Sequence, residues 1–298
     1  MRAGTVAVVG RANAGKSTLI NVLVGEKVSI VSPKPQTTRD RILGVLTTDD
    51  YQIVFADTPG IYKAGGALNN FMQKTAVSAR EDVDLIMFVI DGHAGVRSED
   101  LSLLKTVSEK ADNVIVVMTK TDIMPENEIP LELVKFADFG LDVIPVSARR
   151  GKNLKELIKV ILEKLPDGDK VFEEDIISDR SERFMISEIM REKILLKFDK
   201  EIPHGVAIII NEFKRRSSGN LYDISLDIVC EKPAHKSILI GKQGRAIKEV
   251  SSFARADMEK FLDAKVFLTT YVKVKENWRD SESLVREYGY NISELNLK

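Results

Sequence analysis

In the first 165 residues, short and nearly continuous apolar runs alternate with longer segments whose apolar residues recur at helical spacing. Such runs, rich in β-branched residues, are typical of strands that are buried on both faces. The predicted strands are residues 5–9, 53–56, 84–90, 113–118 and 143–146, and the predicted helices are Lys16–Val24 and residues 69–81, 98–109, 131–139 and 154–165. Because strands alternate with helices, the pattern predicts an α/β fold with a mostly parallel sheet and helices on both faces.

This alternation ends at Leu165-Pro166-Asp167-Gly168-Asp169, where proline and glycine stop a helix. We therefore expect a first domain over residues 1–165, a polar linker over 166–180 and a second domain over 181–298. In the second domain the pattern predicts a helix at 182–198, strands at 206–214 and 221–230, a segment at 236–240, a helix at 244–262, a strand at 266–275 and a last helix near 281–288. This order is that of a small α+β module.

The composition is that of a folded protein without a membrane span. Among the 298 residues, 44% are hydrophobic and 30% are charged, and no apolar run approaches the ~18 residues that a span needs. The N-terminal residues lack the apolar stretch of a secretory signal. The single cysteine, Cys230, excludes an internal disulfide and a multi-cysteine zinc site. We therefore expect a cytoplasmic protein in which Cys230 is a buried small apolar residue.

The net charge of −1 is unevenly distributed along the chain. Residues 1–180 carry 23 basic and 27 acidic side chains, whereas residues 181–298 carry 21 and 18. The second domain is therefore the more favourable place for a polyanion to bind.

A glycine-rich segment with the spacing G-x-x-x-x-G-K-[ST] follows the first predicted strand. Its residues are Gly10-Arg11-Ala12-Asn13-Ala14-Gly15-Lys16-Ser17-Thr18. Backbone N–H groups of such a loop, together with the N-terminus of the next helix, bind phosphate oxygens. Lys16 would contact the β- and γ-phosphates and Ser17 would ligate Mg²⁺. An ordinary glycine-rich turn between strand and helix is the alternative interpretation.

Polar residues follow three further predicted strands, where they could complete a nucleotide site. Asp57-Thr58-Pro59-Gly60 places a carboxylate that could reach Mg²⁺ through water and a glycine N–H that could reach a γ-phosphate, although such a turn is common. In Thr119-Lys120-Thr121-Asp122, the aspartate could accept from N1–H and the exocyclic amine of guanine. Adenine lacks this pair of donors and would leave the carboxylate unpaired, so guanine is predicted.

The stem of Lys120 would pack over the base and sugar, and the backbone of Ser147-Ala148-Arg149 could donate to the guanine carbonyl oxygen. A solvated charge pair in a loop is the alternative interpretation of Lys120 and Asp122.

The second domain contains a G-x-x-G loop in basic surroundings. The loop residues are Ile240, Gly241, Lys242, Gln243, Gly244 and Arg245, with Lys236 and Lys248 nearby. A G-x-x-G loop between two helices clamps the RNA backbone in KH domains, and we expect the strand at 224–229 to line the groove for bases. The motif alone is weak, because Gly92-His93-Ala94-Gly95 also matches it. An accessory domain whose glycines merely cap a helix is the alternative.

In this order, the motifs resemble the translation-factor type of GTPase and, in particular, the Era family. Pro35-Gln36-Thr37-Thr38-Arg39 resembles its switch I and Asp57–Ile61 its switch II; residues 187–195 and 274–280 resemble segments of its second domain, so the resemblance spans nearly the whole chain. It implies a P-loop GTPase domain followed by a type II KH domain. Thr38 would be the switch I ligand of Mg²⁺ that senses the γ-phosphate, beside Ser17 and Asp57.

The resemblance also implies a function. The chain would be a GTP-binding and GTP-hydrolysing switch with GTP or GDP and Mg²⁺ as its cofactors. It would bind the single-stranded 3′ region of 16S rRNA and assist maturation of the small (30S) ribosomal subunit. A monomer with peripheral association to the inner face of the cell membrane is expected from the family.

Three positions depart from the family pattern. Thr119 stands where the family usually has asparagine, and Ala12 and Ala14 stand where it has proline and valine. Ile61 occupies the position of the water-orienting glutamine of Ras-like GTPases, so slow intrinsic hydrolysis is predicted. The expected catalytic residues are Lys16, Thr38, Gly60 and Asn13, the last as a ligand for a stimulating K⁺ ion.

Three other function classes stay open: an adenine-nucleotide enzyme, an RNA-binding protein that does not hydrolyse its nucleotide, and a GTPase whose second domain binds only protein. Trp278 is expected in the core, and Lys214-Arg215-Arg216 is either a phosphate patch or a solvated hairpin end.

Overall fold

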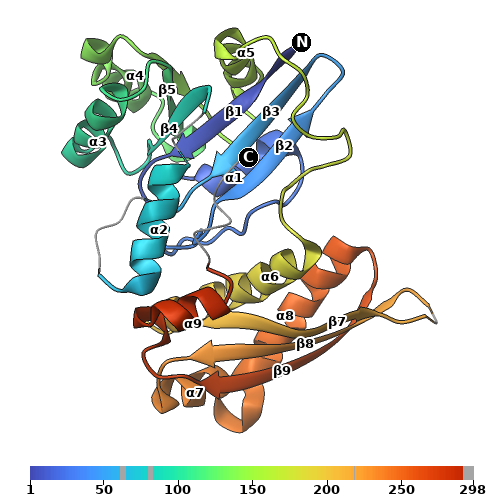
Figure 1. Ribbon diagram of the computed structural model, residues 1–298. Helices are drawn as coiled ribbons and strands as arrows, with labels where there is room; N and C mark the ends of the chain where they lie inside the picture. The colour runs from blue at the N-terminus through green and yellow to red at the C-terminus, as the bar shows by residue number, and fades with distance from the viewer. Residues whose placement is uncertain (61–64, 80–82, 218, 291–298) are drawn as a thin grey trace.

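A computed structural model describes residues 1–60, 65–79, 83–217 and 219–290, and Figure 1 shows them arranged in two parts. The first part is built on a six-stranded sheet with the order β2-β3-β1-β4-β5-β6. Its strands are β1 (Arg2–Val9), β2 (Ile42–Thr47), β3 (Tyr51–Asp57), β4 (Leu85–Asp91), β5 (Val114–Thr119) and β6 (Asp142–Pro145). All neighbours are parallel except β2, which pairs with β3 in an antiparallel hairpin. The predicted fold class is confirmed, but β2 was not predicted.

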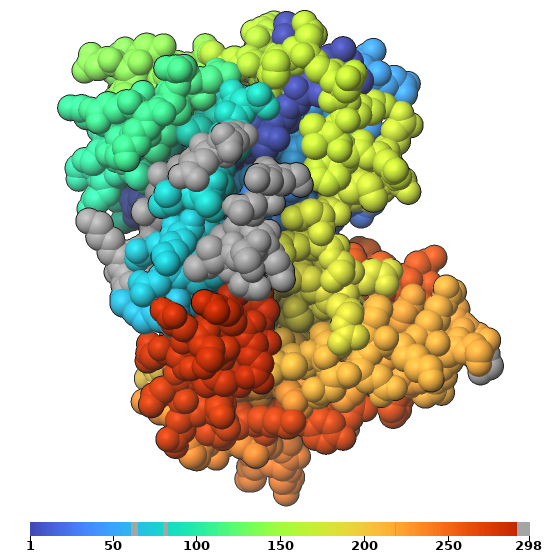
Figure 2. All heavy atoms as spheres, in the orientation of Figure 1, coloured from blue at the N-terminus to red at the C-terminus, as the bar shows by residue number. Residues whose placement is uncertain are grey.

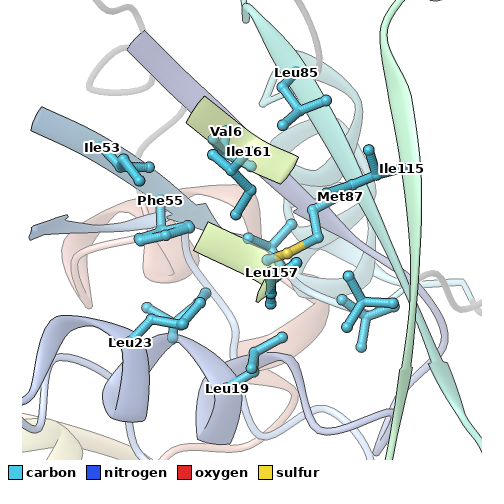
Figure 3. Packing of buried hydrophobic residues seen from close by; sticks show 14 of the residues in the cluster. Val6, Leu19, Leu23, Ile53, Phe55, Leu85, Met87, Ile115, Leu157 and Ile161 are labelled. Atoms are coloured by element: carbon cyan, nitrogen blue, oxygen red, sulfur yellow. The ribbon is translucent and has the colours of Figure 1, made fainter. Parts of the chain in front are cut away.

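Helices cover both faces of this sheet. They are α1 (Lys16–Val24), α2 (Ala67–Ser78), α3 (Ser98–Ser108), α4 (Glu128–Val134) and α5 (Leu154–Lys164). Figure 3 shows one side of the core, where Leu19 of α1 and Leu157 of α5 face Phe55 and Met87 of the sheet. A second cluster, which includes Leu104 of α3, lies on the opposite face.

The helix predicted at 131–139 is wrong in its bounds. The α-helix begins at Glu128 and ends at Val134, and a 3₁₀ turn, Ala137–Phe139, follows. The earlier start is possible because Pro130 lies in the first turn, where a backbone N–H has no helical acceptor.

The segment 166–180, predicted as a linker, lies along the edge of the first sheet. The N–H of Val45 in β2 donates to the carbonyl of Ile177 at 2.8 Å. Phe172 and Ile176 pack against the apolar side chains of β2 and β3, and the side chain of Gln52 accepts from the N–H of Phe172. The segment is therefore fixed to the first part.

The second part is a three-stranded sheet, order β7-β8-β9, with helices on one face. Its elements are α6 (Glu182–Lys197), β7 (Ala207–Arg215), β8 (Leu221–Cys230), α7 (Pro233–Ile240), α8 (Arg245–Leu262), β9 (Lys265–Val274) and α9 (Glu282–Glu287). β7 is antiparallel and β9 parallel to β8. α6, α7 and α8 contribute to a single core with the sheet, and this order confirms the predicted α+β module.

The opposite face of the second sheet is covered at one end. There α2 of the first part and the region around α9 pack on Ala207 and Val229. Trp278 is fully buried in this contact and donates from Nε1 to the carbonyl of Gly205 at 3.0 Å, which confirms its predicted place in the core. Within the described residues, no helix is both long and apolar enough to cross a bilayer.

Candidate nucleotide site and nucleic-acid interface

The predicted P-loop surrounds the N-terminus of α1, directly after β1. A side chain at Gly10 would place its Cβ 2.2 Å from the carbonyl oxygen of Val89, so only glycine allows this approach of the loop to β4. Gly15 has a left-handed φ of 88° and precedes the first helical residue, Lys16. The loop borders a cavity of about 640 Å³. The predicted residues that line it are Ala12, Asn13, Gly15, Lys16, Ser17, Thr18, Thr38, Gly60, Lys120 and Arg149.

Lys16 brings a buried positive charge to this cavity. Its Nζ donates to the carbonyls of Gly10 at 3.1 Å and of Arg11 at 3.0 Å. Burial lowers the pKa of Lys16 to about 8, although the nearby Asp57 carboxylate raises it. An anion in the cavity would favour the charged form of Lys16 and raise this pKa, so the site is suited to phosphate.

The three predicted Mg²⁺ ligands lie together although they come from three segments. Asp57 Oδ2 is 2.7 Å from Ser17 Oγ and 3.3 Å from Thr38 Oγ1, and the two hydroxyl oxygens are 3.0 Å apart. Asp57 Oδ1 is buried without a hydrogen-bond partner among the described residues, and burial raises the pKa of Asp57. An oxygen cluster with an unpartnered carboxylate oxygen fits a hard divalent cation such as Mg²⁺.

The residues after Asp57 approach the P-loop closely. A Cβ on Gly60 would lie 2.8 Å from both N and Cα of Ala12, so the backbone of Gly60 can reach the cavity only without a side chain. The hydroxyl of Thr58 instead donates to the carbonyl of Val8 at 2.8 Å, so this side chain supports the strand rather than the cavity. Ile61, the position predicted to lack a water-orienting group, lies outside the described residues.

The loops after β5 and β6 meet beside the P-loop. Lys120 Nζ donates to the carbonyl of Asn13 at 2.8 Å and pairs with Asp91 at 2.6 Å. Ser147 Oγ donates to Asp122 Oδ1 at 2.7 Å, which orients the predicted guanine acceptor. The N–H of Thr121 donates to the carbonyl of Val146, which joins the two loops.

The departure at Thr119 has a structural explanation. Thr119 Oγ1 lies 2.6 Å from the carbonyl oxygen of Ala14 and 3.0 Å from that of Ile90. Threonine is therefore long enough to fasten the P-loop to β5, and its side chain supports the site rather than the base directly.

Two predicted P-loop side chains bind protein groups. Arg11 pairs with Asp100 of α3 at 3.1 Å, so its backbone, and not its guanidinium, is left for the phosphates. The Nδ2 of Asn13 donates to the carbonyl of Pro33 at 2.6 Å, which leaves its amide oxygen as the candidate K⁺ ligand.

Sequence reasoning missed several residues of the cavity wall. Asp91 is the last residue of β4, just as Asp57 ends β3 and Thr119 ends β5, so its position was a usable signal. The stretch 30–33 carried no motif. Leu196 belongs to α6 in the second part, and nothing in the sequence placed it at the nucleotide site.

The segment 27–41, which contains the switch I match, is bound to α6 at Lys27, Val31 and Thr37. The N–H of Val31 donates to Glu192 Oε1 at 2.9 Å, and Lys27 pairs with Glu192 Oε2 at 2.7 Å. Arg191, which is 1% exposed, donates to the carbonyl of Thr37 and pairs with Glu188.

Arg39 binds the same segment to the loop that precedes β7. It is 2% exposed, and it donates to the carbonyls of Val206 at 2.7 Å and His204 at 2.8 Å and to the hydroxyl of Tyr290 at 3.1 Å. The predicted switch therefore contacts the nucleotide cavity on one side and the second part on the other.

The G-x-x-G loop connects α7 and α8, as a KH domain requires. Gly241 and Gly244 have left-handed φ angles of 72° and 74°, and nothing lies within 4 Å of a Cβ at Gly244, so a phosphate could approach there. Ile240 is the last residue of α7. Lys242, Gln243, Arg245 and Lys248 are exposed and Lys236 is half-buried. Among the described residues, the side chains of Lys236, Lys242, Arg245 and Lys248 form no ion pair.

A groove of about 460 Å³ lies between α8 and β9, and Lys248, one of the cations near the loop, borders it. The expectation that the strand at 224–229 lines it is wrong, because β8 is the central strand and its helix-facing residues Ile224, Leu226 and Ile228 are buried in the core. The wall is the edge strand β9. The missed lining residues are Ile247, Ser251, Ser252, Arg255, Val266, Phe267, Leu268 and Thr270.

The remaining candidates are structural or peripheral. Cys230 is buried, as predicted. Arg216 at the β7–β8 turn pairs with Asp223. His93 Nδ1 lies 3.1 Å from the carbonyl oxygen of Ile123.

Comparisons with known proteins give the same two parts. Residues 5–120 match the family described as 50S ribosome-binding GTPase, and residues 201–279 match the KH domain family. GTPase Era of Clostridium kluyveri is 45% identical over 293 residues, 97% of this chain and 99% of that protein. An Aquifex aeolicus Era variant bound to GDP and AlF₄⁻ has a TM-score of 0.94 at 38% identity, covering 98% of this chain and 100% of the other. Era in complex with MgGDPNP and nucleotides 1506–1542 of 16S ribosomal RNA gives 0.94 at 39% identity with the same coverage.

Proposed function

Because the chain belongs to the Era family of GTPases, we propose that it is a GTP-driven switch that binds the single-stranded 3′ region of 16S rRNA through its KH domain and assists maturation of the 30S subunit. One observation carries the proposal. Thr38 lies 3.0 Å from Ser17 in the nucleotide site, while the carbonyl of its neighbour Thr37 is bound by Arg191 of α6. The state of the nucleotide and the position of the KH domain are thus connected through adjacent residues.

The residues of the cavity have distinct roles in GTP hydrolysis. Lys16 and the P-loop N–H groups would bind the phosphates and stabilise the charge that develops as water attacks in line. Ser17, Thr38 and Asp57 would hold Mg²⁺, which supplies positive charge beside the phosphates. The amide oxygen of Asn13 would ligate K⁺. With isoleucine at 61, we expect slow intrinsic turnover that KCl raises and NaCl does not.

The same geometry gives the switch its direction. Loss of the γ-phosphate removes a contact of Thr38 and frees the segment 35–39 to move. Arg39 and the Thr37 carbonyl are bound to the second part, so this movement changes how the KH domain sits and hence its affinity for RNA. A monomer, a cytoplasmic location and peripheral membrane association remain predictions of the family resemblance.

Nucleotide choice is tested with fluorescent analogues of GTP and ATP. We expect strong preference for the guanine nucleotide, lost in Asp122→Asn, and loss of binding to both in Lys16→Ala. Equal affinity for the two analogues would favour an adenine-nucleotide enzyme. Single-turnover phosphate release, measured beside the binding, separates a GTPase from a chain that binds GTP without hydrolysing it.

RNA binding and coupling are tested together. Affinity for an oligonucleotide from the 3′ end of 16S rRNA is measured with a GTP analogue, with GDP and without nucleotide. We expect the nucleotides to differ, and Gly241→Asp with Gly244→Asp to abolish binding in all three conditions. Gly219→Asp, at a hairpin turn with open space around its Cβ, is the matched control. Unchanged RNA binding in the double variant would leave a GTPase whose second domain binds only protein.

A further inference from the structure

The outer face of the second sheet, opposite α6 and α8, has an uncovered end with two exposed aromatic rings. Thr270 of β9 lies 3.2 Å from Ser251 of α8, so the alternate residues of β9 point to the other face. Phe267 and Tyr271 lie there and are 59% and 55% exposed. The region around α9 covers only the end at Val229, while the β7–β8 hairpin extends to the right, away from α9, in Figures 1 and 2.

The charges nearest the rings are paired, so this face does not repel a negatively charged, aromatic ligand. The Arg216 guanidinium lies 5.9 Å from the centre of the Phe267 ring and is fixed by two bonds to Asp223. Asp227, on the same face, is paired with Lys273 at 2.6 Å. Glu212 forms no ion pair among the described residues, and Lys214 follows it two positions later on β7. The two carboxylates nearest the rings are therefore neutralised, and their partners Arg216 and Lys273 keep 44% and 61% of their side chains exposed.

The face is continuous with the groove beside the G-x-x-G loop. Phe267 belongs to the edge strand β9, and it borders the groove between α8 and β9 as well as the outer face. An RNA strand that leaves the groove over the edge of β9 would therefore contact Phe267 first. Tyr271 lies four residues after Phe267 along β9, a rise of about 13 Å, so each ring would stack its own base rather than share one.

We infer that Phe267 and Tyr271 form a stacking platform for unpaired bases of single-stranded RNA that extends beyond the KH groove. Rings on an open sheet face bind bases in this way, because every base has a face to stack and Arg216 adds a cation beside the first ring. The inference rests on the proposed RNA binding by the KH domain.

The test compares two oligonucleotides on the full chain. One is about four nucleotides long, enough for the G-x-x-G groove, and the other contains the same core extended at both ends. Tyr271→Ala should weaken the long oligonucleotide about five-fold to a hundred-fold and leave the short one unchanged. Phe267→Ala should weaken the long oligonucleotide more than the short one, because the Phe267 ring also borders the KH groove. Tyr271→Trp should keep the affinity, and its fluorescence should be quenched by the long oligonucleotide but not by the short one.

The controls separate this inference from the proposed function. Phe253→Ala removes a ring that is 60% exposed on α8 and is not part of the groove wall or the outer face; it should change neither affinity. Gly241→Asp should abolish binding of the short oligonucleotide, and if it does not, KH recognition itself fails. Equal losses for both oligonucleotides in Tyr271→Ala, or no loss for either, would overturn the platform, and the second outcome would leave this face to a protein.

Discussion

Replacement of Arg191 by methionine should both destabilise the protein and weaken the coupling between nucleotide and RNA. Methionine retains most of the side-chain length, so the change removes chiefly the charge and the hydrogen bonds. Arg191 Nε lies 2.7 Å from Glu188 Oε1, and its Nη2 donates to the carbonyl of Thr37 in the predicted switch I.

The size of the effect follows from burial. Glu188 is 8% exposed, so the single substitution leaves a buried carboxylate without its partner, at a cost of about 3–5 kcal/mol. If Glu188 is replaced by glutamine as well, the uncompensated charge is gone and the Thr37 carbonyl alone lacks its donor, at a cost of about 1–3 kcal/mol. The double variant Arg191→Met/Glu188→Gln should therefore be more stable than the single variant Arg191→Met.

Two measurements check this. Urea unfolding can be followed by the fluorescence of Trp278, the single tryptophan of the chain, which is buried in the second part. RNA affinity with a GTP analogue and with GDP gives the coupling, and we expect the ratio of the two affinities to approach one in both variants. Lys197→Met is the matched control, because Lys197 is also on α6 and its exposed pair with Glu249 of α8 should contribute under about 1 kcal/mol.

The reasoning is refuted if the double variant is as unstable as the single one, since the cost would then not come from an unpaired charge. It is also refuted if both variants keep the difference between GTP analogue and GDP, because the contact with Thr37 would then not transmit the nucleotide state.

Three further predictions concern single sites. Burial, and then nearby cations, lower the pKa of the half-buried His204 below 6.5. The unfolded chain therefore binds more protons than the folded one, and the free energy of unfolding should fall as the pH drops below 6.5. In urea titrations at several pH values, this decline should be shallower in His204→Gln and the same as wild type in His93→Gln, an exposed control. Thr119→Val should weaken fluorescent GDP binding roughly five-fold or more by removing the hydroxyl donor that lies between the Ala14 carbonyl of the P-loop and the Ile90 carbonyl of β4, whereas Thr119→Ser keeps the hydroxyl and should bind normally. Gly60→Ala should weaken the GTP analogue more than GDP, because the added methyl meets the P-loop backbone at 2.8 Å; Gly65→Ala, with open space around its Cβ, should change neither affinity.

Much of the first part could be predicted because its strands are buried on both faces and appear as continuous apolar runs. β2 was missed, since Ile42–Thr47 is read equally well as the end of a loop until its antiparallel pairing with β3 is known. The α4 region was misplaced because a proline normally argues against a helix, yet at Pro130 it lies in the first turn, where it is tolerated.

The nucleotide site was predictable where chemistry follows a local motif, as for Lys16, Ser17 and Asp57. Their convergence at strand ends follows from the parallel sheet. The contribution of Leu196 was not predictable, because it depends on how the second part packs against the first. For the same reason, the wall of the KH groove was assigned to β8, when the strand order places β9 at the edge.

The contact of residues 166–180 with β2 also covers the edge of the first sheet. β2 is the outermost strand, and a bare outer strand offers unpaired N–H and C=O groups to other chains, which favours aggregation. The bond from Val45 to Ile177 and the packing of Phe172 occupy that margin. A fragment intended to carry the nucleotide site alone should therefore end near residue 180. A fragment that ends at residue 165 would leave the edge of β2 unpaired and would aggregate, whatever its affinity for GTP.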